Sequence, residues 1–316
     1  MARRTIAVTP VMLAVAIAIR STIGTVHHFA DARRSCPPLS GRASPQIVLQ
    51  APETGSGWRE RYAWRFGEDA EPLLGRVASP NELERLPAAE GSFGAWLRRL
   101  PVKPGTPPVR LFDGRLKANQ SAHHAVVDID VGGRDLQQCA DAVIRLRAEY
   151  LWAAGCADSI SFCFSSGDPA SWGAWEAGYR PSAQGSSVTW ARTAPEEGTY
   201  AAFRRYLDTV FTYAGSASLE RELVRVSDPS KPEIGDVFIQ GGFPGHAVLV
   251  ADVAEDDHGR RWFVLVQSYM PAQEVHVLRN PLGTWSPWYP AHASGALVTP
   301  EWTFSHEDLH RFPVLG

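Results

Sequence analysis

Three residues of this sequence carry side chains that could act together in catalysis: Cys139, His246 and Gln267. A cysteine thiolate is a nucleophile, a histidine can exchange its proton, and a polar third group can hold the imidazole in one tautomer. Cys139 falls in the first turn of a predicted helix, where the positive end of the helix dipole favours the thiolate. We therefore predict a Cys–His–Gln site for hydrolysis or transfer at an amide bond.

The two polar members of this set lie on neighbouring predicted strands. The segment from Gly235 onwards indicates three short strands, Asp236–Ile239, His246–Val253 and Arg261–Gln267. A Gly/Pro turn places His246 at the start of the second strand, and an Asp-Asp-His-Gly turn joins it to the third. Antiparallel pairing brings the start of one strand near the end of its partner, so His246 and Gln267 are expected to be close.

The thiol is expected on the strongest helix of the chain. Asp135 and Gln138 have the spacing of a capping box, an apolar stripe follows, and Gly155 ends the helix. Gln137, Gln138 or a backbone N–H of the same turn could stabilise an oxyanion. Cys139 also lies on the apolar stripe, so an ordinary buried cysteine is the alternative interpretation.

Further residues are candidates for oxyanion or substrate binding around this site: Gln138, Lys117, Gln120 and Tyr269. The polar stretch that contains Lys117 and Gln120 could equally be a solvated turn. A metal site built from His123, His124, His246 and Asp252 is a weaker alternative, because adjacent histidines of a strand point to opposite faces and these four residues show no His-x-x-x-His spacing. We predict neither a metal nor another cofactor.

The N-terminal region is predicted to direct export. Arg3 and Arg4 precede an apolar run of about 15 residues, Thr5–Ile19, which is short for a membrane span and typical of a signal-peptide core. Residues 1–32 are therefore a signal peptide or an uncleaved anchor, and the Pro/Gly/Ser-rich residues 33–60 are a flexible linker. We expect the protein in the periplasm, in the cell envelope or secreted, with membrane contact only through its N-terminal segment. Export permits disulfides, and Cys156 and Cys163 are close enough in sequence to close a small loop.

The remaining residues, 61–316, are predicted to form one α+β domain, because helices precede a run of antiparallel strands. A final short helix is expected at Ser305–Phe312. The net charge of −3 among 316 residues gives no electrostatic reason to expect a nucleic-acid partner. The eleven tryptophans, many of them in predicted loops, could fill a core or line a groove. A non-catalytic envelope module that binds a glycan or a peptide is therefore the alternative to the hydrolase.

Several segments resemble a bacterial family known as domain of unknown function 4846: DLQQCADAVIRLRAEYL, GDVFIQGGFPGHAVLVADVA, QSYMPAQEVHVLRNP and TPEWTF. More distantly, the glycine-histidine pair at Gly245–His246 after a helix that begins with Cys139 resembles the papain-like NlpC and CHAP cell-wall peptidases. The resemblance implies a papain-like α+β fold in which the helix that carries the cysteine packs on an antiparallel sheet. It also implies a thiol protease or amidase whose substrate is peptidoglycan peptide.

Overall fold

The computed structural model describes residues 57–185 and 187–314 of the chain. The predicted signal or anchor at 1–32, and the predicted linker at 33–60 except for its last four residues, lie outside this part. The described residues combine helices with antiparallel sheet, so the α+β prediction is confirmed. None of their helices is long and apolar enough to cross a membrane.

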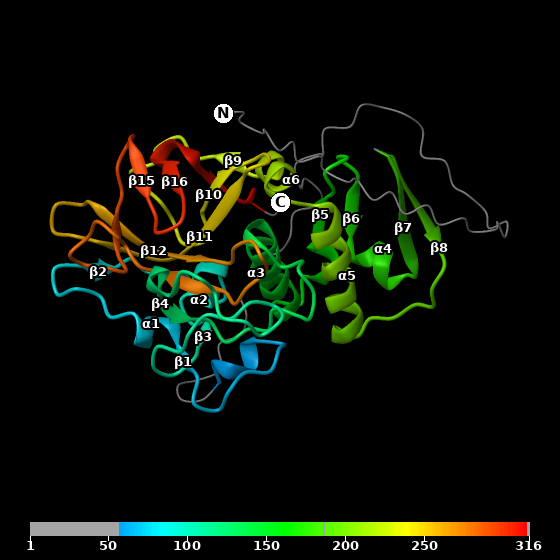
Figure 1. Cartoon of the computed structure of the whole chain (residues 1–316), viewed down its shortest axis with the longest axis horizontal. Helices are drawn as coiled ribbons and strands as arrows, with labels where there is room; N and C mark the ends of the chain where they lie inside the picture. The colour runs from blue at the N-terminus through cyan, green and yellow to red at the C-terminus, as the bar shows by residue number, and fades with distance from the viewer. Residues whose placement is uncertain (1–56, 186, 315–316) are drawn as a thin grey trace, which may run out of the picture.

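A nine-stranded antiparallel sheet dominates the fold (Figure 1). Its main path runs, in spatial order, through β4 (His123–Val126), β13 (His276–Leu278), β12 (Arg261–Gln267), β11 (His246–Glu255), β10 (Val237–Gln240), β17 (Leu309–Arg311) and β9 (Val224–Arg225). Two short strands join it from the side: β2 (Glu84–Arg85) pairs with β11, and β14 (Tyr289–Pro290) pairs with β12. The predicted order of β10, β11 and β12 along the chain is therefore also their order in the sheet.

Six helices lie in the described residues: α1 (Leu73–Arg76), α2 (Phe93–Leu97), α3 (Cys139–Ala153), α4 (Trp172–Glu176), α5 (Tyr200–Tyr213) and α6 (Ser216–Glu222). Short 3-10 turns occupy Arg59–Arg61, Gln120–Ala122, Ala157–Ser159 and His306–Asp308. The other strands form two-stranded sheets: β1 (Glu71–Pro72) with β3 (Pro101–Val102), β5 (Ser161–Cys163) with β6 (Pro169–Ser171), β7 (Tyr179–Gln184) with β8 (Ser187–Arg192), and β15 (Ala296–Val298) with β16 (Thr303–Ser305).

Strand β11 is the centre of the core, because both of its faces are covered. Side chains alternate between the faces of a strand. Ala247 and Leu249 therefore join the hydrophobic cluster that contains the α3 residues, whereas Val248 and Val250 join a second cluster on the opposite face. A strand buried on both faces is expected to be almost continuously apolar, which explains the Ala-Val-Leu-Val run after His246.

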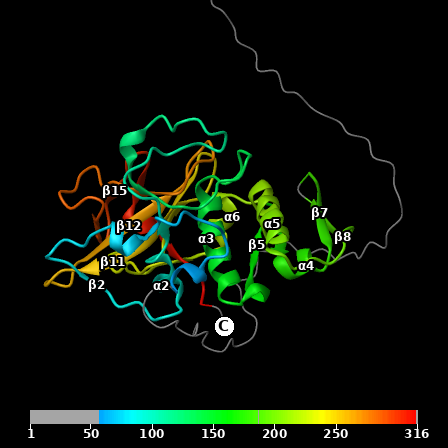
Figure 2. The same cartoon turned by 90° about the horizontal axis from the view of Figure 1, so that it is seen from below.

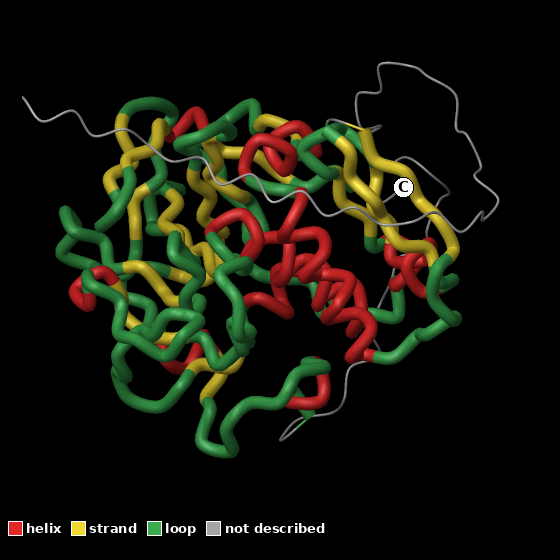
Figure 3. Tube along the Cα trace, turned by 45° about the vertical axis from the view of Figure 1, so that its right-hand side comes forward, coloured by secondary structure: helices red, strands yellow, loops and turns green. Residues whose placement is uncertain are grey.

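Helix α3 lies between the main sheet and the part of the molecule formed by α4, α5 and β5–β8 (Figures 1 and 2). The same arrangement is visible in the tube representation, where the helices gather beside the strands of the sheet (Figure 3). Because α3 is covered on both sides, even its charged residues Asp141, Arg145 and Glu149 are buried. The helix that carries Cys139 therefore packs on the antiparallel sheet, as predicted.

Three local predictions are corrected by the structure. Helix α3 begins at Cys139 rather than Asp135, and its N-cap is Gln138. The segment Ser305–Phe312 is not a helix, because after one 3-10 turn its backbone pairs with β10 as strand β17. Cys156 is a free thiol, so no disulfide with Cys163 closes the small loop.

Candidate functional site

The site begins at a tight turn that leads into β11. The residue before His246 is Gly245, and a Cβ added there would lie 2.6 Å from the carbonyl oxygen of Gly242 and 2.7 Å from that of Gln240. Only glycine leaves room for this close approach of backbone to backbone. The glycine of the sequence pattern thus fixes the path by which the chain delivers His246 to the sheet.

Replacing Gly245 with alanine is expected to lower the free energy of unfolding by about 1–3 kcal/mol, because the added methyl group overpacks a rigid backbone turn. Gly173 provides the matched control: it lies in α4, and an added Cβ there meets no atom within 4 Å. Gly173→Ala should leave stability unchanged or raise it by up to about 1 kcal/mol. Urea unfolding of both variants measures the difference, and equal effects at the two positions would contradict the role given to Gly245.

His246 is joined directly to the predicted third member of the site. Its Nε2 lies 2.9 Å from Oε1 of Gln267, and both side chains are buried. The contact arises because β12 runs antiparallel to β11 and ends at Gln267, beside the start of β11. Burial, opposed by the hydrogen bond to Gln267, lowers the pKa of His246 to about 4. The imidazole is therefore neutral at physiological pH and able to accept a proton.

An aromatic cage surrounds this imidazole and consists of Tyr269, Trp302 and Phe304. The centroid of the His246 ring lies 4.9 Å from that of Tyr269, 5.3 Å from that of Trp302 and 5.7 Å from that of Phe304. Phe304 is almost parallel to the imidazole, and Tyr269 meets it edge-on. This apolar lining explains why burial dominates the lowered pKa of His246.

Cys139 is the first residue of α3 and is half-buried. Burial raises the pKa of its thiol to about 11, against the opposing effect of backbone N–H groups that belong to Ala247, Ala140 and Cys139 itself. The influence of Ala247 indicates that the thiol lies near the start of β11. A thiol with this pKa is protonated at pH 7, so it needs a base before it can attack.

The start of α3, which carries the thiol, and the imidazole lie on different faces of the sheet. His246 packs on Phe304, which belongs to the cluster opposite α3, whereas Ala247 packs on the α3 side. Antiparallel strands direct alternate N–H groups to alternate neighbours. The N–H of Val250 donates to the carbonyl oxygen of Asp236, on the β10 side of the strand. The N–H of Ala247, three residues earlier, therefore points to the other side, towards β12, which has already ended at Gln267. The edge of β11 beside Ala247 is therefore open, and no hydrogen bond joins the Cys139 thiol to the His246 imidazole within the described residues.

The segment that precedes Cys139 is fastened to the turn after β12. The Ser268 hydroxyl donates to the carbonyl oxygen of Gln137 at 3.0 Å, and the Ala272 N–H donates to Oδ1 of Asp135 at 2.7 Å. Asp135 therefore anchors this segment instead of capping the helix, and Asp141 accepts the N–H of Gln138 in its place. These contacts hold the start of α3 against the same turn that carries Tyr269.

The predicted substrate-binding residues have different environments. Nε2 of Gln138 donates to Asp135, and the Gln120 amide is bonded to the backbone of Val109 and Lys117, which makes it a brace for its own loop. Lys117 is buried with its Nζ 2.7 Å from Oε2 of Glu301. Tyr269 alone among the four touches His246 directly.

Two further residues join the site that the sequence did not single out. Glu301 accepts a hydrogen bond from Nε2 of Gln267 at 2.8 Å, and Nε2 of His276 lies 3.3 Å from the same amide nitrogen. Glu301 follows a proline in a turn, and His276 sits in an apolar strand, so neither has a local sequence pattern that marks it. Only the pairing of β13 with β12 brings His276 beside Gln267.

The metal alternative has no geometric support within residues 57–185 and 187–314, where no group of three or more His, Cys, Asp and Glu side chains could hold a metal ion. Asp252 forms ion pairs with Arg85 and Arg98, and Nε2 of His123 contacts the carbonyl oxygen of Pro107.

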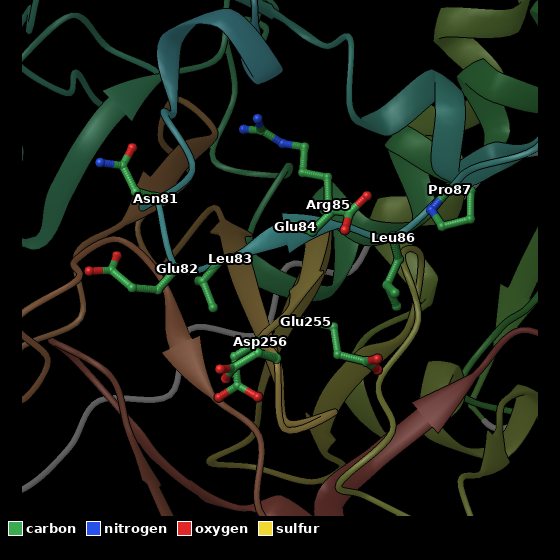
Figure 4. A pocket seen from close by; sticks show the side chains of 10 residues that line it. Asn81, Glu82, Leu83, Glu84, Arg85, Leu86, Pro87, Glu255 and Asp256 are labelled. Carbon is green, nitrogen blue, oxygen red and sulfur yellow. The ribbon is translucent and has the colours of Figure 1, made fainter.

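A hollow of about 590 Å³ lies at β2 and the β11–β12 turn, lined among others by Glu82, Glu84 and Asp256 (Figure 4). It is at the opposite end of β11 from His246 and does not belong to the site.

Comparison with known protein families gives a match over most of the chain. The family described as domain of unknown function (4846) matches residues 73–311, which include all the site residues described above. No curated protein and no solved structure matches the chain.

Proposed function

Because this chain belongs to the family described as domain of unknown function (4846), whose name assigns no activity, we propose its function from the site itself: thiol-dependent cleavage of an amide bond. The observation that carries the proposal is the hydrogen bond between His246 and Gln267 at the start of β11, the strand on which the helix that begins with Cys139 packs. A nucleophile, a base and a group that orients the base form the minimal set for this chemistry.

The states of the two titratable groups suggest how the reaction starts. Near pH 7 both the thiol of Cys139 and the imidazole of His246 are neutral, because burial raises the pKa of the first and lowers that of the second. His246 bonds Gln267 through Nε2, so Nδ1 is the nitrogen that remains to take the thiol proton. This is general-base activation at the moment of attack, in place of a resting thiolate–imidazolium pair.

The reaction then follows the chemistry of an acyl transfer. The sulfur attacks the substrate carbonyl while its proton moves to Nδ1 of His246, and the resulting oxyanion needs hydrogen-bond donors. The backbone N–H groups of Cys139, Ala140 and Ala247, which lower the pKa of the thiol, are the candidates for this role. Nδ1 returns the proton to the leaving amine as the C–N bond breaks, and water attacks the thioester to release the acid and regenerate the thiol.

We place this activity in a papain-like fold in the broad sense, in which a helix that begins with cysteine packs on an antiparallel sheet that bears the histidine and its polar partner. Helix α3, β11 and β12 support that description. The proposed substrate is a peptidoglycan peptide, and the proposed location is the cell envelope or beyond. Both rest on the apolar N-terminal segment Thr5–Ile19 and on the resemblance to cell-wall peptidases.

Incubation of the protein with purified peptidoglycan fragments tests the proposal. Mass spectrometry should detect new peptides that differ from the substrate by the addition of one water at a broken amide bond. The Cys139→Ala variant should give none. Cys156→Ala is the matched control, because Cys156 is also a free thiol but lies after the other end of α3 and outside the site.

Two outcomes would overturn the proposal. Equal cleavage by wild type and Cys139→Ala would remove the thiol from the mechanism. Binding of the fragments without cleavage, unchanged by Cys139→Ala, would instead support the envelope binding module.

A further inference from the structure

We propose that Glu301, held by Lys117, is a positioning residue that orients the Gln267 amide and thereby keeps the proton of His246 on Nε2, with Nδ1 free for Cys139. This inference rests on the proposed function for its purpose, although its geometry stands independently. Glu301 lies 34 residues after Gln267 along the chain and meets it only in the folded protein.

The orientation of the Gln267 amide follows from its neighbours. Oε2 of Glu301 lies 2.8 Å from one end of the amide, and a carboxylate can only accept hydrogen bonds. That end must therefore be the NH₂ group, because an amide oxygen there would face the carboxylate oxygen at hydrogen-bond distance. The other end, which faces His246, is then the carbonyl oxygen.

His276 supports the same orientation from another direction. Its Nδ1 lies 2.8 Å from the carbonyl oxygen of Glu274, so Nδ1 carries the proton and Nε2 has a free lone pair. This Nε2 lies 3.3 Å from the Gln267 amide nitrogen and can accept its second hydrogen. Both partners of the NH₂ group are thus acceptors.

The tautomer of His246 follows from the amide. The Gln267 oxygen can only accept, and it lies 2.9 Å from Nε2 of His246, so Nε2 must donate. In a neutral imidazole the other nitrogen then has no proton. Nδ1 makes no hydrogen bond to any residue of the described part of the chain, so its lone pair is free.

Lys117 completes the arrangement by holding the carboxylate. Its Nζ lies 2.7 Å from the same Oε2 that accepts from Gln267, and the lysine side chain is 4% exposed. Lys117 also lies over the ring of Tyr269, with Nζ 5.2 Å from the ring centroid. A buried pair of this kind fixes the position of the carboxylate more firmly than a solvated glutamate would, because hydrogen bonds to charged groups are short and strong.

The tautomer can be measured directly by long-range ¹⁵N–¹H NMR correlation on full-length protein with ¹⁵N-labelled histidine. The Cys139→Ala background is used so that the thiol cannot influence the imidazole, and His246→Gln assigns the signals by their loss. We expect His246 with a protonated Nε2 and an unprotonated Nδ1. A protonated Nδ1 in this protein would overturn the proposal, whatever the catalytic assays show.

Two variants in the same background test whether Glu301 enforces the tautomer. Glu301→Gln keeps an acceptor oxygen for Lys117 and Gln267 and should keep the tautomer of His246. The double variant Lys117→Met with Glu301→Met removes the acceptor without leaving a buried charge, so we expect it to fold. Its ratio of the Nε2-protonated to the Nδ1-protonated tautomer of His246 should fall at least about tenfold, which is the effect of losing one hydrogen bond to a charged group. An unchanged ratio in the folded double variant would remove Glu301 from this role.

The test separates this inference from the proposed function because it needs no substrate. If the tautomer behaves as expected but peptidoglycan fragments remain intact, the positioning role stands and the amide-cleaving activity falls. If cleavage occurs but the double variant keeps the tautomer, the activity stands and Glu301 has no part in orienting Gln267.

Discussion

Alkylation of Cys139 by iodoacetamide is expected to accelerate about tenfold for each pH unit from pH 6 to pH 10 and to reach no plateau in that range. Burial raises the pKa of this thiol from 9.0 to about 11, so at pH 7 its thiolate fraction is about 100-fold below that of an unperturbed cysteine. The greater nucleophilicity of a more basic thiolate offsets roughly tenfold of this difference. At pH 7 we therefore expect a rate about tenfold below that of a cysteine peptide.

The measurement is peptide mapping of the Cys139 adduct over time at each pH. His246→Gln is the matched control: burial lowers the pKa of His246 to about 4, so the imidazole carries no positive charge in this range and its removal should leave the profile unchanged. A plateau below pH 7 that disappears in His246→Gln would show a resting thiolate–imidazolium pair. The general-base mechanism proposed above would then be wrong.

Replacing Arg145 with methionine is expected to lower the free energy of unfolding by about 3–5 kcal/mol. The Arg145 side chain is fully buried in α3, where its guanidinium donates to Glu149 at 2.6 Å and to Gln137 at 2.8 Å. Removing one partner leaves the buried Glu149 carboxylate with only the Tyr200 hydroxyl as a donor. The substitution also leaves Oε1 of Gln137, which is buried, without the hydrogen bond that Arg145 donates to it.

A double-mutant cycle distinguishes loss of the ion pair from loss of packing volume. Arg145→Met with Glu149→Met should recover most of the lost stability, because no unpaired charge remains in the core. Urea unfolding of wild type, both single variants and the double variant gives the coupling energy. Additive effects of the two substitutions would show that Arg145 contributes through its volume alone.

Local patterns in the sequence predicted the central hairpin well. The expected bounds of β12 agree with the structure, and β11 begins at the predicted His246. Alternating burial, a Gly/Pro turn and an apolar stripe are determined by residues only a few positions apart, so they can be interpreted without knowledge of distant contacts.

Distant contacts caused the errors. Asp135 has the spacing to cap a helix, but its carboxylate instead accepts the N–H of Ala272, and α3 starts four residues later. The segment Leu309–Arg311 has a helical pattern, yet Phe238 of β10 offers Leu309 a partner in the sheet. The helix propensity of a short segment decides little when the segment can instead pair with an open strand edge from a distant part of the chain.

The sequence by itself determined that Cys139 lies at the start of a helix, that His246 lies at the start of a strand, and that Gln267 lies at the end of the following strand. Antiparallel pairing then made the contact between His246 and Gln267 foreseeable. Only the tertiary structure decided that the imidazole lies on the face away from α3 and that Glu301 and Lys117 complete the hydrogen-bonded group around Gln267. The reason is physical: the two-residue period of a strand sets which face a side chain takes, whereas the partners on that face come from segments far apart in the chain.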